Sequence, residues 1–155
     1  MMRLPHFKYH APTTVREVAD LLAAPGDAML VAGGTDLLTN MKRRQQVQQT
    51  LIGLRRVAEL RAIESTAIEC SAGLSGPREL TIGAGVTLTE IVRDRRVRDS
   101  YGALWQAASS VATPHLRNMG TLGGNLCLDT RCNYYDQNYE WRKAIDFCMK
   151  KDGET

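Results

Sequence analysis

The chain of 155 residues has the length of one ordinary domain, and its 43% hydrophobic and 24% charged residues are typical of a globular protein in water. A net charge of +3 is too small to indicate nucleic acids or anionic membranes as partners. No apolar run approaches the roughly 18 residues of a membrane span, and the N-terminus lacks the apolar core of a signal peptide. We therefore expect a cytoplasmic protein with neither a nucleic-acid nor a membrane partner.

The first 54 residues are predicted to form a small βαβ unit. In chain order, the pattern predicts a strand at 7–9, a helix at 14–24, a buried strand at 28–32, a short helix at 37–43 and a strand at 50–54. Thr14-Val-Arg-Glu17 fits the capping-box pattern that begins a helix. Strand, helix and strand at this spacing favour a parallel pairing of the last two strands.

The residues after 54 are predicted to form a second α/β unit. In chain order, we expect a turn or helical piece at 57–63, strands at 64–70 and 79–84, a helix from 87 to about 93 and a helix at 101–112. Thr87-Leu-Thr-Glu90 is a second capping box, and Pro114 is expected to end or kink the last helix. We interpret the basic clusters 42–44 and 93–98 as solvated helix ends and Cys70 as a small buried hydrophobe.

Two glycine-rich stretches are candidate binding loops. Gly33 and Gly34 directly follow the strand at 28–32, and Thr35-Asp36 is expected to cap the next helix. The second stretch is 117–132, which contains three glycines within residues 120–124. Glycine lets a ligand approach the backbone closely, and successive backbone N–H groups can bind one phosphate. The alternative interpretation is a tight connection between packed elements, and neither stretch matches the Rossmann or Walker patterns.

Three segments resemble, in order and spacing, the FAD-binding medium subunit of the molybdenum hydroxylases, the family of the xanthine and carbon monoxide dehydrogenase flavoproteins. They are Val31–Leu38, Ile82–Thr87 and Arg117–Asn125. The resemblance implies an α/β (α+β) FAD-binding domain of the molybdopterin dehydrogenase type, which we expect to be truncated. It further implies a βαβ subdomain at 1–54, a second, incomplete subdomain at 55–126 with the flavin between them, and the start of an inserted loop at 127–155.

The resemblance implies FAD contacts from all three segments. The glycine loops at 33–36 and 121–125 would hold the pyrophosphate, while Ala84-Gly85 would lie near the flavin or ribityl chain or simply form a strand-ending turn. For the ribose we weigh Asp129 against Asn133 and favour Asn133. The complete set of predicted cofactor contacts is Val31, Ala32, Gly33, Gly34, Thr35, Asp36, Leu37, Ala84, Gly85, Val111, Thr121, Leu122, Gly123, Gly124, Asn125 and Asn133.

The segment after Asn125 departs from most of that family and resembles the β subunit of 4-hydroxybenzoyl-CoA reductase. In that subunit an inserted loop carries four cysteines that hold a 4Fe-4S cluster. The resemblance implies Cys132 and Cys148 as two of the metal ligands, with the rest of the set missing from this chain, and we expect Cys127 to line the interior behind the glycine loop. By spacing alone, the cysteines match no ferredoxin run and no zinc pair.

The implied function is an FAD-binding electron-transfer subunit of a molybdenum–flavin–iron–sulfur oxidoreductase. The 4-hydroxybenzoyl-CoA reductase-like version would remove a phenolic hydroxyl to give benzoyl-CoA, with ferredoxin as donor, a small 2Fe-2S subunit and a large molybdopterin subunit as partners. The alternatives are a medium subunit of a xanthine, CO or aldehyde type of molybdenum hydroxylase, or a non-catalytic fragment. No acid–base residue is assigned, because His115 is interpreted as a partly buried polar residue, and we expect the isolated chain to be inactive.

Overall fold

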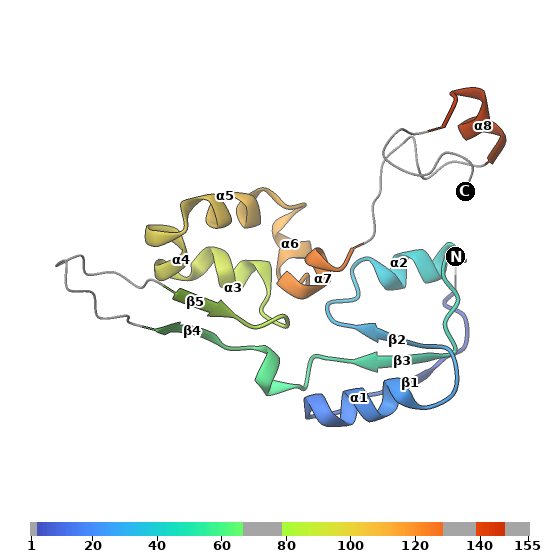
Figure 1. The fold of residues 1–155 in the computed structure, drawn as a ribbon, viewed down its shortest axis with the longest axis horizontal. Helices are drawn as coiled ribbons and strands as arrows, with labels where there is room; N and C mark the ends of the chain where they lie inside the picture. The colour runs from blue at the N-terminus through green and yellow to red at the C-terminus, as the bar shows by residue number, and fades with distance from the viewer. Residues whose placement is uncertain (1–2, 67–78, 129–138, 148–155) are drawn as a thin grey trace.

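The computed structural model describes residues 3–66, 79–128 and 139–147, with two α/β units side by side (Figure 1). The elements of the first unit are β1 (Lys8–His10), α1 (Val15–Ala23), β2 (Ala28–Val31), α2 (Leu37–Lys42) and β3 (Thr50–Gly53). The strands form one sheet in the order β1-β3-β2, and both pairings are parallel. The predicted βαβ arrangement and its parallel pairing are therefore confirmed.

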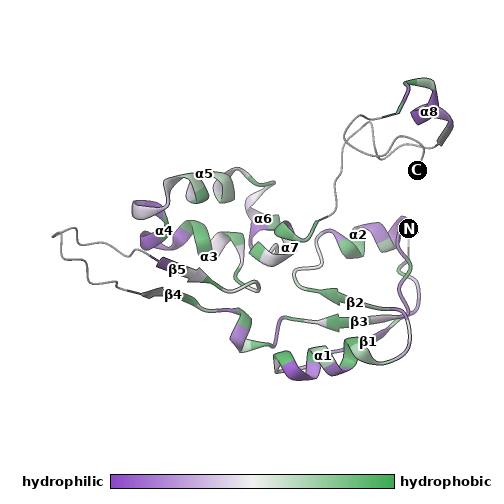
Figure 2. Ribbon diagram, in the orientation of Figure 1, coloured by the Kyte–Doolittle hydropathy of each residue, from purple (hydrophilic) through white to green (hydrophobic). Residues whose placement is uncertain are grey.

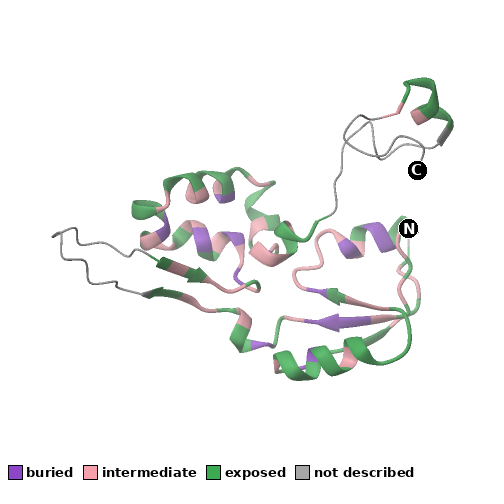
Figure 3. Ribbon diagram, in the orientation of Figure 1, coloured by how far each residue is buried: buried purple, intermediate pink, exposed green. Residues whose placement is uncertain are grey.

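The central strand β3 contributes side chains to the hydrophobic clusters on both faces of the sheet, because successive side chains of a strand point to opposite faces. Leu51 packs with Met41 of α2 on one face, and Ile52 packs with Val18 of α1 on the other. Leu51, Ile52 and Met41 are at most 1% exposed. The strands β2 and β3 are accordingly mostly hydrophobic (Figure 2), and β3 carries the densest run of buried residues in this sheet (Figure 3).

Two details of the first unit differ from the sequence prediction. Thr14 caps α1 by accepting a hydrogen bond from the Glu17 N–H at 3.2 Å, but the Glu17 carboxylate accepts from the N–H of Thr13 rather than of Thr14, at 2.7 Å. Only half of the predicted capping box is therefore present. The strand at 28–32 is also less buried than predicted, because β2 lies at the sheet edge and Leu30 is 39% exposed.

A short 3₁₀ helix, η1 (Ala58–Leu60), connects the two units, and it lies within the turn or helical piece that was predicted at 57–63. The second unit contains β4 (Ile63–Thr66), β5 (Glu79–Ile82), α3 (Leu88–Arg93), α4 (Arg95–Ser100), α5 (Gly102–Ser110), α6 (Pro114–Arg117) and α7 (Leu122–Leu126), and α8 (Tyr139–Ala144) follows. β4 and β5 are antiparallel, and α3, α4 and α5 lie on one side of them (Figure 1). The core of this unit contains Val86, Leu88, Ile91, Val97 and Ala108.

The helices of the second unit correct two predictions. Pro114 does not end α5, which stops at Ser110; it occupies the first turn of α6, where its missing N–H is not needed. The basic cluster 93–98 does lie at helix ends, since Arg93 is in the last turn of α3 and Arg98 in the last turn of α4, and between them the Asp94 carboxylate accepts from the Arg96 N–H at 2.8 Å and begins α4. The predicted glycine loop at 120–124 is in fact the entrance of α7, which Thr121 caps.

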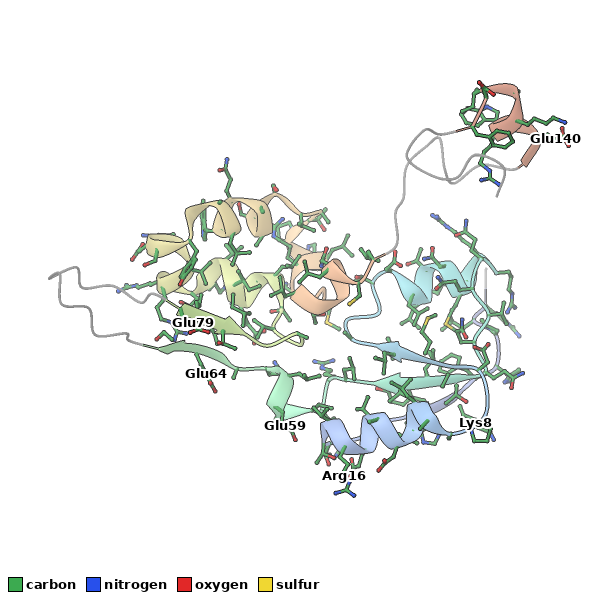
Figure 4. All side chains as sticks on the ribbon, viewed as in Figure 1. Lys8, Arg16, Glu59, Glu64, Glu79 and Glu140 are labelled. Carbon is green, nitrogen blue, oxygen red and sulfur yellow. The ribbon has the colours of Figure 1, made fainter. Side chains whose placement is uncertain are left out.

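The charged side chains labelled in Figure 4 are all exposed, and they come from both units and from α8. Within the described segments, no helix is long and apolar enough to cross a bilayer. The predictions for Cys70, Asp129, Cys132, Asn133 and Cys148 fall outside the described residues.

Candidate functional site

The two glycine stretches meet at the junction of the units. A Cβ atom added at Gly33 would lie 1.9 Å from the carbonyl oxygen of Met119, and one added at Gly120 would lie 4.0 Å from Oγ1 of Thr35. The turn after β2 therefore packs directly on the backbone that leads into α7. Segments separated by more than 80 residues in the sequence form one continuous wall.

The third segment of the resemblance joins the same wall through backbone hydrogen bonds. The N–H of Leu122 donates to Val86 at 2.9 Å, and the N–H of Gly123 donates to Ala84 at 2.9 Å. A Cβ atom added at Gly123 would lie 2.7 Å from Cβ of Ala84. Gly123 is therefore required for close packing of α7 against residues 84–86.

A cleft of ≈ 240 Å³ opens where these segments converge. Its walls come from both units, since residues that follow β2 and β3 face Arg61, which follows η1, and residues of the β5–α3 connection, α3 and the α6–α7 connection. The lining residues are Ala32, Gly33, Leu54, Arg55, Arg61, Gly85, Thr87, Thr89, Glu90, Arg93, Asn118, Met119 and Thr121. Four of the predicted contacts are among them, namely Ala32, Gly33, Gly85 and Thr121.

Other predicted contacts from the first segment lie behind the cleft wall. Val31 and Leu37 belong to the buried core of the first unit. Asp36 precedes α2 but does not cap it with its side chain, and its carboxylate instead accepts a hydrogen bond from Nδ2 of Asn40 at 3.0 Å. Gly34 has φ +70°, a left-handed conformation that favours glycine.

The remaining predicted contacts support the second unit. Val111 follows α5 and packs, with Leu122, against the core of that unit. Nδ2 of Asn125 donates to the carbonyl of Thr121 at 2.9 Å. Ala84 and Gly124 contact Gly123 and Thr121, respectively, within the wall. Their contacts with a cofactor stay a prediction.

The two glycine stretches differ in their available backbone donors. At the start of α7, the N–H groups of Leu122, Gly123 and Gly124 all donate to protein acceptors, the last to Oγ1 of Thr121 at 3.1 Å. Within the described residues, by contrast, the N–H groups of Gly33 and Thr35 donate to no protein acceptor. Free backbone donors for an anion are thus concentrated in the first stretch.

The cleft carries an excess of positive charge. Arg55, Arg61 and Arg93 line it together with a single carboxylate, Glu90. Arg61 lies 3.3 Å from Oε1 of Glu90, while Oε2 of Glu90 accepts from both the N–H and the hydroxyl of Thr87 at 2.7 Å. The Thr87 backbone hydrogen bond is the main cause that lowers the pKa of Glu90, which keeps the carboxylate ionised.

The sequence reasoning missed these side chains of the cleft. Arg55 lies just beyond the end of β3, after Leu54, and the carboxyl ends of parallel strands are where ligands of α/β sheets bind, so its position was a usable signal. Arg93 was grouped with a solvated helix end. Thr87 was identified only as the start of a capping box, which α3 confirms. No local sequence pattern marked Asn118 or Thr89 as cleft residues, because only the fold brings these two side chains together.

Two further predictions are wrong. Cys127, expected to line the interior, is exposed, because it follows the last turn of α7. His115, expected to be partly buried, is exposed on α6. Among the described residues there is no cluster of three histidine, cysteine or acidic side chains suited to a metal.

The family model and the most similar proteins found by comparison all point to the same family of flavoprotein subunits. Residues 5–135 match the family described as "FAD binding domain in molybdopterin dehydrogenase". The chain is 34% identical to the xanthine dehydrogenase FAD-binding subunit of Escherichia coli O157:H7, over 77% of this chain and 38% of that protein. It is 36% identical to the carbon monoxide dehydrogenase medium chain of Hydrogenophaga pseudoflava, over 79% of this chain and 39% of that one.

The fold comparison agrees. In the crystal structure of quinoline 2-oxidoreductase from Pseudomonas putida 86, a chain with 37% identity superposes with a TM-score of 0.68, over 81% of this chain and 40% of that one. The sequence-predicted fold class is therefore confirmed. The chain spans about two-fifths of the length of the relatives it matches.

Proposed function

This chain belongs to the family of FAD-binding domains of molybdopterin dehydrogenases, and we propose that it binds FAD as part of the medium subunit of a molybdenum hydroxylase. The observation that carries the proposal is the convergence of Gly33, Gly85 and Met119, one from each of the three segments, on one cleft with an excess of hydrogen-bond donors. Pockets between two units are common positions for cofactors.

The residues of the cleft suit the diphosphate of a dinucleotide. A diphosphate carries negative charge and only acceptor oxygens, and the cleft is lined by Gly33, whose backbone N–H donates to no described protein acceptor, and by three arginines. Its ≈ 240 Å³ is below the range of roughly 300–1,000 Å³ for pockets that enclose a whole drug-sized ligand. We therefore assign the cleft to the diphosphate and its immediate neighbours rather than to the entire cofactor.

In this proposal the protein binds and orients the cofactor and supplies no acid–base group of its own. When bound, FAD supplies a redox centre that accepts and donates electrons. Gly33 keeps the first loop close to the second, and Thr121 holds the entrance of α7 by accepting from the Gly124 N–H. The partners we propose are a large molybdopterin subunit that binds the substrate and a small 2Fe-2S subunit.

A narrower candidate is a subunit of a 4-hydroxybenzoyl-CoA reductase-like complex with ferredoxin as electron donor. It is favoured by one observation, the cysteines of the segment after Asn125, and it requires a 4Fe-4S cluster with Cys132 and Cys148 among the ligands. The broader proposal requires no cluster in this subunit, and the relatives described above act in xanthine and carbon monoxide dehydrogenases. Iron content of a full-length version of the subunit therefore separates the two candidates.

The test is a titration of FAD with the purified chain, followed by flavin absorbance and fluorescence, with iron and acid-labile sulfide assayed on a full-length version of the subunit. We expect saturable flavin spectral changes. Absence of iron from the full-length subunit supports the molybdenum hydroxylase candidate, and four iron atoms per full-length subunit support the reductase-like candidate. If FAD gives no saturable change, the proposal that this chain binds the cofactor is wrong.

A further inference from the structure

The side chains of the cleft offer donors that the protein itself does not use. Arg55 and Arg93 both line the cleft, and neither forms an ion pair or hydrogen bond with any other described residue. Surface arginines commonly pair with carboxylates, but Glu90, the one carboxylate among the described residues that line the cleft, is shared by Arg61 and Thr87. Two guanidinium groups therefore face the cleft with their hydrogen-bonding capacity available.

A third available donor is held in a fixed orientation. The hydroxyl of Thr89 donates to Oδ1 of Asn118 at 2.8 Å, so the amide oxygen of Asn118 is occupied from the side of α3. The Nδ2 group of Asn118 has no acceptor among the described residues, and the residue lines the cleft. An amide with its oxygen engaged and its N–H groups available binds ligand acceptors.

We propose that Arg55, Arg93 and Asn118 form a side-chain anion subsite that binds the diphosphate of the cofactor directly and selects ligands that carry a diphosphate. The inference rests on the proposed function, and it adds charged side chains to a site that the glycine motifs describe only by backbone groups. Guanidinium groups bind phosphate oxygens by paired, charge-assisted hydrogen bonds. Inorganic pyrophosphate and ADP should consequently bind the same cleft and compete with FAD, whereas riboflavin should not compete.

The subsite also explains the position of Glu90. An unpaired carboxylate in the wall would repel a diphosphate, but each oxygen of Glu90 is directed to a protein donor, and one of these donors is the cationic Arg61. The wall thus keeps a net positive charge from the unpaired Arg55 and Arg93. The carboxylate serves the capping box of α3 and holds Arg61 at the edge of the site.

The experiment measures binding of FAD, riboflavin and inorganic pyrophosphate to the wild-type chain and to the Arg55→Gln, Arg93→Gln and Asn118→Asp variants. Arg95→Gln is the matched control, because Arg95 is an exposed arginine close to Arg93 in sequence that does not line the cleft. Asn118→Asp keeps the acceptor for Thr89 and replaces the available N–H groups by a charged oxygen. The changed side chains are exposed, so we expect unfolding midpoints close to wild type.

We expect each of the three cleft variants to weaken the binding of FAD and of pyrophosphate by about 10- to 100-fold, as for loss of a hydrogen bond to a charged group. Arg95→Gln should bind as wild type, and Arg55→Lys should recover part of the loss. Pyrophosphate binding that depends on Arg55 and Arg93, without FAD binding, would support the subsite and refute the proposed function. FAD binding within twofold of wild type in all three variants would overturn the subsite alone, and no binding of either probe to wild type would overturn both.

Discussion

Replacing Gly33 by alanine tests whether the contact between the two glycine stretches holds the site together. The added Cβ would lie 1.9 Å from the carbonyl oxygen and 2.6 Å from the carbonyl carbon of Met119. Both are backbone atoms, so no side-chain rotation relieves the overlap, and the oxygen must retreat to at least 3.0 Å. Overpacking of this kind costs about 1–3 kcal/mol. The displaced segment carries Gly120 and Thr121, so the cleft changes shape together with the loss of stability.

The assay combines urea unfolding with FAD titration. For Gly33→Ala we expect a free energy of unfolding lower by about 1–3 kcal/mol and FAD binding weaker by at least roughly tenfold, which corresponds to about 1.4 kcal/mol. The control is Gly102→Ala, since a Cβ at Gly102 meets nothing within 4 Å at the start of α5. That variant should be unchanged or up to about 1 kcal/mol more stable. If Gly33→Ala matched the control in both measurements, the packing argument would be refuted.

Other predictions concern the cap of α7, the pH dependence and the core. Thr121→Val removes the acceptor of the Gly124 N–H and should cost about 0.5–2 kcal/mol in urea unfolding, whereas Thr121→Ser should restore most of it. Because folding lowers the pKa of Glu90, its stabilising contribution should be complete above its ordinary value of 4.5 and be lost as the pH falls through the lower folded value. Acid titration of unfolding should therefore show a smaller loss in Glu90→Gln than in wild type. Met41→Ala, at a position with 0% exposure, should cost about 2–5 kcal/mol, whereas Leu126→Ala, at 76% exposure, should stay within about 0.5 kcal/mol of wild type.

Local patterns were sufficient to predict most of the first unit. A short apolar run predicted β3, whose adjacent Leu51 and Ile52 pack on opposite faces of the sheet. The capping box at Thr87 predicted the start of α3, because the reciprocal hydrogen bonds involve residues only three positions apart. Predictions that depend on neighbours a few residues away were therefore the reliable ones.

Predictions failed where the outcome depends on distant packing. Pro114 is compatible both with ending one helix and with beginning another, and the choice was set by the turn at Val111 and Ala112 that precedes α6. Burial of Cys127 was inferred from its place after a glycine stretch, but α7 ends there and leaves the side chain exposed. Tertiary context determines both outcomes, and the sequence gives no local signal for it.

The residues of the site were likewise predictable only where local motifs mark them. The motifs predicted which segments converge, and the direct contact of Gly33 with the Met119–Gly120 backbone agrees with that prediction. They did not predict Arg55 or Arg93, because a single arginine after a strand or at a helix end is most often a solvated side chain. Their significance appears only when the fold places both on one wall with a carboxylate that is already engaged.

The sequence left two interpretations of the glycines open, a loop that binds a ligand and a tight connection between packed elements, and different glycines fit different ones. Gly123 is needed because α7 packs against Ala84, and the neighbouring N–H groups are engaged inside the protein, so the second stretch is chiefly a packing device. Gly33 serves both purposes, since it permits the close approach to Met119 and leaves its own N–H available at the cleft. A side chain at Gly123 should therefore reduce stability and FAD affinity in parallel, whereas loss of Arg55 or Arg93 should reduce affinity alone. This difference separates residues that build the cleft from residues that bind in it.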